Sequence, residues 1–580
     1  MILKALYDYY ERKASDAQSN IAPEGWEWKE IPYVIVINNE GKFVAIEDTR
    51  EGEGKKKRAK KFLVPQTVKR TVGINANLLW DNIEYALGAN PRNRSDINER
   101  FSLFKKRIKD EIDINNFLNV RTLLFFLENN PVLQIESSDY YQVWNQIIEE
   151  NPFIVFKIDG SAHSCICDDL RGALKIITSQ TGNDVCLLTG KVNTEVERLH
   201  PAVKGVRGGN TQGGALISFN LSSFNSYGKT QNFNAPIGKR GAFAYTTALN
   251  VLLGKDSKNK ITIADSTIVF WSEKKTEDMN PEEIFPWVIA VQKTEKDNPD
   301  AGVDKIEKFI QSIFTGTYQQ AKTNHFFVLG LSPNAARISV RFWKTPSFED
   351  FGLNIKKHFD DFEIIRGPKE VKYLSLYQIL SATALQYKME NVPPNIVGRV
   401  IESIIDGTPY PQSLLQQCIR RIRAEQNVNR VRAAIIKAYF NRLNRIQKQN
   451  KKEITMSLDL NNKEAAYRIG RLFAALEKIQ EEANPGINAT IRDRFYGAAS
   501  TSPVTVFPRL LSLKNSHLKK LSEGRKTNFE KLIGEIVNEI KTFPSNLSLN
   551  DQANFAVGYY HQRQDFFTKK SDKEDSNNNN

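Results

Sequence analysis

Basic side chains gather in a short segment near the start of the chain, directly before a polar loop that contains glycine. The segment comprises Lys55, Lys56, Lys57, Arg58, Lys60 and Lys61. Because unpaired charges are costly to bury, these side chains must lie in solvent or against an anion. The loop that follows carries Lys69, Arg70, Thr71, Gly73 and Asn75, which suit contact with a base edge or a phosphate. The combination favours a nucleic-acid contact, and the alternative is a solvated charge run without a ligand.

A second loop, residues 198–214, combines glycines with basic and amide side chains. Its candidate contacts are Lys204, Arg207, Gly208, Gly209, Asn210 and Gln212. Glycines let a backbone approach a ligand, bare backbone amides hold phosphates, and amide side chains bond base edges. No Gly-Lys-Ser/Thr closes the loop, so it does not match a phosphate-binding P-loop. The alternative is a surface loop with no ligand.

Aromatic, amide and lysine side chains alternate in residues 226–236, which include Tyr227, Lys229 and Phe233. This mixture suits a nucleic-acid surface, through stacking and polar contacts. The alternative is that the rings fill a small peripheral core.

An arginine-rich stretch, residues 414–448, has helical periodicity with an expected break near Asn427. Its basic residues include Arg420, Arg421, Arg423, Arg430, Arg432, Lys437, Arg442, Arg445 and Lys448, with Glu425 as the one acid among them. A solvated helix usually mixes the two signs of charge. We therefore expect a surface that follows a nucleic-acid backbone.

The sequence is poor in candidates for metal chemistry. Cys165, Cys167 and Cys186 lie in the same part of the chain as His163 and His200. The spacing Cys-x-Cys is not that of a zinc ribbon, and a thiol in an apolar strand is ordinary. We expect no zinc and no cofactor.

Paired carboxylates could hold Mg²⁺ in a nuclease, and such pairs occur at Asp168-Asp169 and Asp360-Asp361. Neither pair belongs to a larger constellation, and no pattern of a nucleophilic enzyme stands out. We therefore expect a protein that is not an enzyme. The alternative is a metal-dependent nuclease that uses Asp168 and Asp169.

The composition favours a folded protein with a polyanionic partner. The chain has 580 residues, 40% of them hydrophobic, and a formal net charge of +14. This length supports several domains, and the charge favours nucleic acid over an anionic membrane surface. No apolar stretch approaches the roughly 20 residues of a membrane span, and the first residues lack the pattern of a signal peptide. With only four cysteines, a disulfide framework is not expected, and we predict a cytoplasmic protein.

Periodicity predicts an α+β fold, with an N-terminal mixed α/β body built on an antiparallel or mixed sheet and an all-α C-terminal helical bundle. Helices are expected at 1–15, 240–253 and 301–314, and throughout 78–150 with breaks at Gly88 and Pro131. Strands are expected at 31–37, 43–46, 153–158, 185–190, 215–219, 268–271, 325–331 and 336–343. Further helices are expected at 464–482, with Asn462 as N-cap, and at 508–521, 528–542 and 548–567.

These elements suggest five regions. An N-terminal α/β region with the basic loop covers 1–150, and an α+β body with the glycine-rich loop covers 151–370. An arginine-rich helical connector covers 371–455, the helical bundle covers 456–568, and a disordered tail covers 569–580.

Six blocks, in the same order and at comparable spacing across most of the chain, resemble one protein family. They lie at residues 1–10, 63–71 (LVPQTVKRT), 79–82, 203–206, 226–229 and 329–337 (LGLSPNAAR). The family is the large subunit of the type I-C CRISPR interference complex (Cascade). The helical C-terminal region resembles the family less distinctively.

The resemblance implies a non-enzymatic subunit of a crRNA-guided ribonucleoprotein, beside backbone subunits and a subunit that binds the crRNA end. Such a subunit reads the protospacer-adjacent motif (PAM) in target double-stranded DNA, aids duplex opening and R-loop formation, and helps to recruit a helicase-nuclease in antiviral defence. Guide pairing then reads the rest of the sequence.

Carried onto this chain, the resemblance implies residues 69–75 as the first choice for PAM contact and residues 204–212 as the second. The run at 55–58, Lys229 and the arginine-rich stretch would hold the nucleic-acid backbone. A pure assembly scaffold without DNA contact is a further alternative.

Met456 lies just before the helix expected at 464–482 and is one of four methionines. Translation that restarts there would yield 125 residues, since 580 − 456 + 1 = 125. The resemblance implies such a separate small subunit, lining the channel of the displaced strand. The alternative is an ordinary loop methionine.

Overall fold

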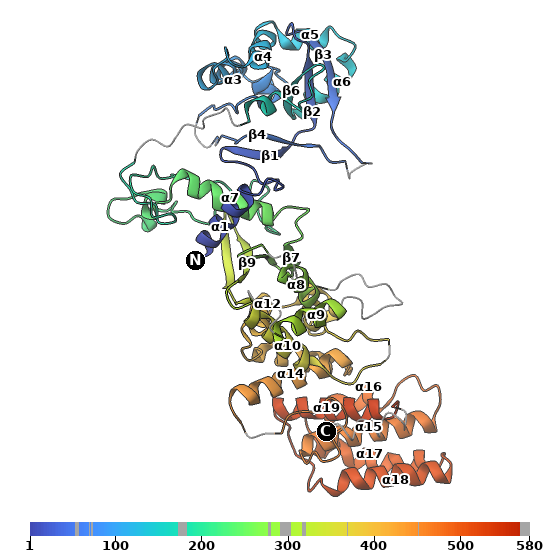
Figure 1. Ribbon diagram of the computed structural model, residues 1–580. Coiled ribbons are helices and arrows are strands. Elements are labelled where there is room, and N and C mark those ends of the chain that lie inside the picture. The colour runs from blue at the N-terminus through green and yellow to red at the C-terminus, as the bar shows by residue number, and fades with distance from the viewer. Residues whose placement is uncertain are drawn as a thin grey trace. The chain divides into compact units, whose positions relative to one another are not determined.

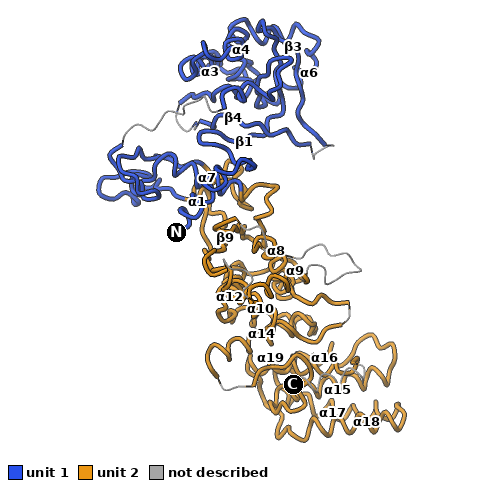
Figure 2. Tube along the Cα trace, viewed as in Figure 1, with its two compact units in different colours: residues 1–201, 217–251 blue, residues 202–216, 252–580 orange. Residues whose placement is uncertain are grey.

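The chain divides into two compact units, coloured separately in Figure 2. The computed structural model describes residues 1–52, 57–68, 70, 73–171, 182–275, 280–290, 303–315, 321–367, 369–449 and 452–568. The first unit comprises residues 1–201 and 217–251, and the second comprises residues 202–216 and 252–580.

The first unit contains a four-stranded mixed sheet of order β3-β2-β6-β5, of which β2, β3 and β6 are labelled in Figure 1. β2 (Tyr33–Ile37) and β3 (Phe43–Asp48) form the expected antiparallel hairpin. β6 (Phe153–Ile158) pairs parallel with β2 and antiparallel with β5 (Trp80–Asn82). All five residues of β2 are buried, as expected for a strand that is covered on both faces.

Short helices between β5 and β6 supply the core of this sheet. They are α2 (Ile83–Ala86), α3 (Ile97–Glu111), α4 (Leu118–Glu128), α5 (Pro131–Glu136) and α6 (Tyr141–Glu150). The predicted helical stretch is confirmed from Ile83 to Glu150, with its breaks at Gly88 and Pro131, whereas its start at 78–82 is wrong because β5 lies there. Phe104 of α3 and Phe126 of α4 each place their ring 6.4 Å from that of Phe156 in β6.

Two predicted helices are confirmed elsewhere in the first unit, α1 (Ile2–Ala14) and α7 (Lys239–Leu252). The rings of Tyr10 and Phe243 meet edge to face at 5.6 Å, and Arg240 pairs with Glu11 and Glu24. A separate two-stranded sheet joins β1 (Trp26–Glu30) to β4 (Lys61–Pro65), and neither strand was predicted.

Two predicted strands are wrong. At 185–190 the chain folds back on itself, because Cys186 N–H donates to the Lys191 carbonyl and Gly190 N–H donates to that of Cys186. At 215–219 only Ala215 makes a bridge, to Arg337, without a continuing ladder. An apolar run of five or six residues meets the pattern of a strand, but only a neighbouring edge makes it one.

The second unit begins with a four-stranded antiparallel sheet of order β10-β9-β8-β7. Its strands are β7 (Lys260–Ile263), β8 (Ser266–Ser272), β9 (Phe326–Asn334) and β10 (Arg337–Lys344). The strands predicted at 268–271, 325–331 and 336–343 are confirmed. α8 (Pro281–Ile289) and α9 (Val303–Phe314) lie between β8 and β9, and α10 (Phe348–Phe362) and α11 (Leu376–Ser381) follow β10.

Helices alone form the C-terminal region, as predicted (Figure 1). They are α12 (Pro394–Asp406), α13 (Gln412–Glu425), α14 (Arg430–Ile446), α15 (Ala465–Ala483), α16 (Ile491–Ala499), α17 (Pro503–Leu518), α18 (Glu523–Asn538) and α19 (Leu549–Asp565). The break expected near Asn427 separates α13 from α14. The predicted tail at 569–580 lies outside the described residues.

Three helix N-termini differ from prediction, and one of them is that of α18, which begins at Glu523 rather than at 528. α17 begins at Pro503 rather than beyond Pro508, since a proline at the first helical position costs no hydrogen bond. The N-cap of α15 is Glu464 and not Asn462, whose side chain instead accepts from the Glu464 N–H at 2.9 Å.

Two glycines set the crossing of α15 and α19. A Cβ built on Gly470 would lie 2.0 Å from the carbonyl oxygen of Phe555, and one on Gly558 would lie 2.0 Å from that of Tyr467. The backbones of the two helices therefore touch, and no larger residue fits at either position.

Candidate nucleic-acid interface

The loop after β4 is fixed at both ends. Trp80 donates its indole N–H to the Pro65 carbonyl at 2.8 Å, and the buried Asn77 side chain accepts from Val68 N–H at 3.0 Å. Gly73 is exposed with φ +76°, and a Cβ there would meet no atom within 4 Å. The glycine therefore serves the backbone conformation of the loop rather than close packing. Of the predicted contacts in this loop, Lys69 and Thr71 lie outside the described residues.

Arg70 directs its guanidinium into the protein. Its Nε donates to the Asn75 carbonyl at 2.7 Å, another of its nitrogens pairs with Asp81, and it lies 4.0 Å from the centre of the Tyr85 ring. Burial raises the pKa of Asp81, and the charge of Arg70 opposes that rise. Arg70 thus shapes the loop and carries the charge that makes a buried carboxylate tolerable, while the Asn75 residue itself is exposed.

An arginine cluster beside this loop went unnoticed in the sequence. The buried carboxylate of Glu84, in the first turn of α2, lies 3.8 Å from Arg92, 3.3 Å from Arg94 and 3.6 Å from Arg100. Arg100 also stands 4.8 Å from the ring of Tyr85, the same ring that Arg70 approaches. The pair of arginines spaced two apart after the Gly88 break was the available signal.

This cluster carries more positive than negative charge. The side chains of Arg92 and Arg94 remain 57% and 37% exposed, and both share the Glu84 carboxylate with Arg100. Arg100 also pairs with Asp96 at 2.8 Å, so three guanidinium groups face two carboxylates. A guanidinium has five N–H donors in a fixed fork, and two carboxylates cannot occupy those of three arginines. The exposed donors suit a phosphate.

The structure describes only part of the basic run at residues 55–61. Lys57 and Arg58 are exposed, and Arg58 exchanges two backbone hydrogen bonds of 2.9 Å with Glu51. Lys55 and Lys56 lie outside the described residues.

The glycine-rich loop belongs to the second unit and is closed by a short stem. Val203 and Gly214 exchange two backbone hydrogen bonds of 2.9 Å, and Arg207 N–H donates to the Thr267 hydroxyl at 2.9 Å. The next residue, Ala215, bonds the backbone at the start of β10 through Ala336 and Ile338. The six predicted contacts of this loop are all exposed: Lys204, Arg207, Gly208, Gly209, Asn210 and Gln212.

Within that loop, the side chain of Asn210 accepts from the Gln212 N–H at 3.0 Å. A shallow pocket beside it is lined by Val206, Gly209, Pro333 and Arg337, among others. The loop therefore has a defined conformation that holds its polar groups together at the surface.

The arginine-rich stretch differs most from expectation, because α14 buries Arg430, Arg432, Lys437 and Arg442. Arg432 is fully buried and donates to the carbonyls of Ala382 and Asn427 at 2.9 Å each. Arg430 is also buried and donates to the carbonyls of Val371 and Lys372. These side chains satisfy backbone groups of the loops around the helix.

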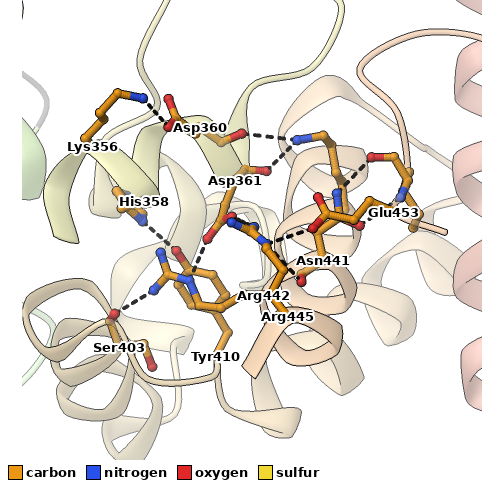
Figure 3. A network of polar contacts seen from close by, with 12 residues as sticks. Lys356, His358, Asp360, Asp361, Ser403, Tyr410, Asn441, Arg442, Arg445 and Glu453 are labelled. Atoms are coloured by element: carbon orange, nitrogen blue, oxygen red, sulfur yellow. Dashed lines mark hydrogen bonds and ion pairs between the residues drawn. The ribbon is translucent and has the colours of Figure 1, made fainter. Parts of the chain in front are cut away.

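Arg442 belongs to a second buried network, shown in Figure 3. Its Nε lies 2.5 Å from Asp361 and one further nitrogen donates to the Ser403 carbonyl at 2.6 Å. Arg445 pairs with the other oxygen of Asp361, and Lys437 donates to the Asp361 carbonyl at 3.0 Å. The prediction that this stretch follows a nucleic-acid backbone is thus wrong for Arg430, Arg432 and Arg442, because α10, α12 and the loops cover them.

A buried histidine, His358, belongs to the same network. His358 makes a 2.8 Å hydrogen bond to the Tyr410 hydroxyl, and burial lowers the pKa of His358 well below its usual value, with Arg442 adding to the effect.

On α13 the arginines differ from those of α14. Arg420 and Arg423 are exposed, whereas Arg421 is largely covered and lies 3.8 Å from Glu425. Among the arginines of α13 and α14 that were predicted to contact the nucleic-acid backbone, Arg420 and Arg423 are therefore exposed, and Arg445 is about half exposed.

No group of three or more potential metal ligands gathers in the described part of the chain. Cys165 and Cys167 are buried, and Cys186 accepts from the Gly238 N–H at 3.3 Å. Asp168 accepts from the Ser164 N–H at 3.0 Å, and Asp169 accepts from Asn119 at 2.6 Å. The two carboxylates of the alternative nuclease are thus both engaged in local structure.

Met456 lies in the segment between α14 and α15 and is about half exposed. Its carbonyl accepts from the Ile365 N–H at 2.9 Å. Residues 456–568 contain α15 to α19. None of the helices in the described ranges has the length and apolar character that crossing a membrane requires.

The fold defines a class of basic proteins with two units. They carry exposed cationic loops on a mixed and an antiparallel sheet, and their C-terminal region is helical. The model of the family described as CRISPR-associated protein (Cas_Csd1) matches residues 6–567. The chain therefore belongs to this family, the large subunit of type I-C Cascade, and the resemblance drawn from the six blocks is confirmed. A comparison with curated proteins finds no significant match.

Proposed function

We propose that this subunit reads the PAM in target double-stranded DNA and aids opening of the duplex beside it. Membership of the Csd1 family places the protein in CRISPR interference, and the pairing of an exposed loop with an arginine cluster supports the finer role. Both features are held by buried partners, so little conformational entropy is lost when they meet DNA.

The two features suit different parts of the duplex. Gly73 and Asn75 are exposed in the loop after β4, where a backbone without a side chain and an amide can reach base edges in a groove. Arg92 and Arg94 present guanidinium donors that suit the flanking phosphates, which position the protein without reading sequence. Lys69 and Arg70 remain proposed contacts, although Arg70 also braces the loop from within.

The phosphate contact is tested by Arg92→Gln in the assembled crRNA-guided complex. The affinity for a PAM-bearing duplex is measured over a series of salt concentrations. Loss of one phosphate contact should weaken binding and flatten the slope of log K against log salt by about 0.9. Lys42→Gln is the matched control, because Lys42 is likewise an exposed cation of the first unit, paired to Glu40 at 2.8 Å. An Arg92 variant with the slope of wild type contradicts the contact.

The base contact is tested by Asn75→Ala. Loss of a base-edge bond should reduce discrimination between a PAM duplex and a scrambled one by about 1–3 kcal/mol and leave the salt slope unchanged. If discrimination is kept, the glycine-rich loop becomes the candidate, and Lys204→Gln with Asn210→Ala should then remove it.

The remaining roles follow from the family. We propose that the protein helps to recruit the helicase-nuclease and that a small subunit begins at Met456. An immunoblot against the C-terminus should show a second band that Met456→Leu abolishes. A single full-length band in both cases removes the internal start.

The two alternatives have distinct signatures. A nuclease would cleave DNA as the purified chain with Mg²⁺ and lose that activity on Asp169→Ala. A pure scaffold would give crosslinks to protein neighbours and none to DNA.

A further inference from the structure

A fully exposed tyrosine stands at the tip of a tight turn in the first unit. Tyr227 is 99% exposed, the largest exposure among the large apolar and aromatic residues of the described ranges. Ser226 and Lys229 form an antiparallel bridge, and Lys229 N–H donates to the Ser226 carbonyl at 2.9 Å. Tyr227 and Gly228 are the two central residues, so the ring projects from the point where the chain reverses.

Hydrogen bonds from the side chain of Asn234 hold the turn in place. Asn234 accepts from the Ser226 N–H at 3.0 Å and donates to the Lys229 carbonyl at 3.1 Å, and it donates to the Gln231 carbonyl as well. Gln231 in turn bonds Arg198. Both strands of the turn are therefore tied to one amide, and the tip is rigid rather than a loose loop.

The backbone at the tip is strained for its sequence. Tyr227 has φ +50° and Gly228 has φ +70°, so both lie in the left-handed region, as in a type I′ turn. Glycine and asparagine fit that region easily, whereas a tyrosine there is disfavoured by its Cβ. With 99% of its surface exposed, the ring recovers almost nothing by packing within the described part of the chain.

The surroundings favour a nucleic acid over a protein as the partner. Residues 217–239 carry two lysines, Lys229 and Lys239, and no carboxylate. The segment is rich in amides, and Lys229 itself lies in the turn at 3.9 Å from Asp184. Lys239 pairs with Glu195 at 2.6 Å, so the acids near this segment come from outside it. An aromatic ring beside an exposed lysine is suited to stack on a base while the cation meets the adjoining phosphate.

We infer that Tyr227 is a stacking contact for an unpaired base of the target DNA once its duplex has opened. This inference rests on the proposed function, because opening supplies the unpaired base. A flat ring on a rigid turn binds the face that every base offers, so the contact holds an opened strand regardless of its sequence.

The test uses the assembled complex and two DNA targets with the same PAM, one fully paired and one with a mismatched bubble beside the motif. Tyr227→Ala should bind the bubble target about tenfold more weakly than wild type. Tyr227→Trp should bind as wild type does, since it keeps the ring. Leu221→Ala is the matched control, because Leu221 is exposed in the same segment without an aromatic ring.

A 2-aminopurine placed in turn at each bubble position locates the contact. We expect quenching at one position with wild type and Tyr227→Trp, and its loss with Tyr227→Ala. Bubble affinity and quenching of Tyr227→Ala equal to wild type overturn the inference. So does an unchanged DNA affinity with loss of a protein subunit from the purified complex, which would make the turn a protein contact. Failure of the proposed function appears separately, as a wild-type complex that does not prefer the PAM duplex.

Discussion

Replacing Asp361 with asparagine should destabilise the second unit strongly. Asp361 sits at the C-terminal end of α10, is 1% exposed, and holds α14 through Arg442 and Arg445 (Figure 3). Asparagine keeps the shape of the side chain and removes its charge. Two guanidinium groups and the nearby Lys437 then face a neutral amide.

The magnitude follows from the burial of each partner. The side chain of Arg442 is only 4% exposed, and removing one partner of a buried pair costs about 3–5 kcal/mol. The side chain of Arg445 is 44% exposed, so its pair adds about 0–1 kcal/mol. Because asparagine still accepts one hydrogen bond, we expect a total near 3 kcal/mol. Domains have total stabilities of about 5–15 kcal/mol, so the loss is a large share.

Hydrogen exchange of the α14 amides measures this locally, without requiring two-state unfolding of the whole chain. Protection in α14 should fall by a factor of about 100, which corresponds to about 3 kcal/mol. Asp360→Asn is the matched control: its side chain is 53% exposed and pairs with Lys356 within α10, so its loss should cost less than about 1 kcal/mol. Equal protection in the two variants would refute the view that these arginines are structural and would return them to the nucleic-acid surface.

Two further predictions concern the helical C-terminal region. Gly470→Ala should lower the free energy of unfolding by about 1–3 kcal/mol in a denaturant titration, because its Cβ would meet the Phe555 carbonyl. Gly534→Ala, whose Cβ would lie in open space on α18, is the control and should raise the free energy of unfolding by up to about 1 kcal/mol. A Gly470→Ala variant as stable as wild type would show that α15 and α19 do not touch. Burial lowers the pKa of His561 to about 3, so its neutral form stabilises the fold fully above about pH 6.5, and this stability is lost as the pH falls towards 3. Between pH 6.5 and pH 5, wild type should therefore lose about 2 kcal/mol more than His561→Gln in urea unfolding, and parallel pH profiles would contradict the buried neutral imidazole.

Much of the fold was readable from local pattern. The apolar stripe of residues 464–482 appears as α15, and the arginine-rich stretch breaks where expected, between α13 and α14. Helical periodicity depends only on residues three or four apart, so the sequence alone determines it. The six family blocks are likewise a property of the sequence, and the family match confirms them.

Tertiary structure decided which residues meet. β2 pairs in parallel with β6, although helices α2 to α6 lie between the two strands in the sequence. The partner of Arg442 is Asp361, 81 residues away. A run of like-charged residues has the same sequence pattern whether its side chains face solvent or backbone carbonyls. The burial of the α14 arginines could therefore not be predicted from the neighbouring residues in the sequence. The Glu84 cluster was hidden for the same reason. The segment around Tyr227 was predicted as a stacking surface, and the structure adds that its ring is fully exposed at a turn. Sequence determined the elements and the family, and long-range packing decided which cations are structural and which remain at the surface, because burial depends on neighbours that are distant along the chain.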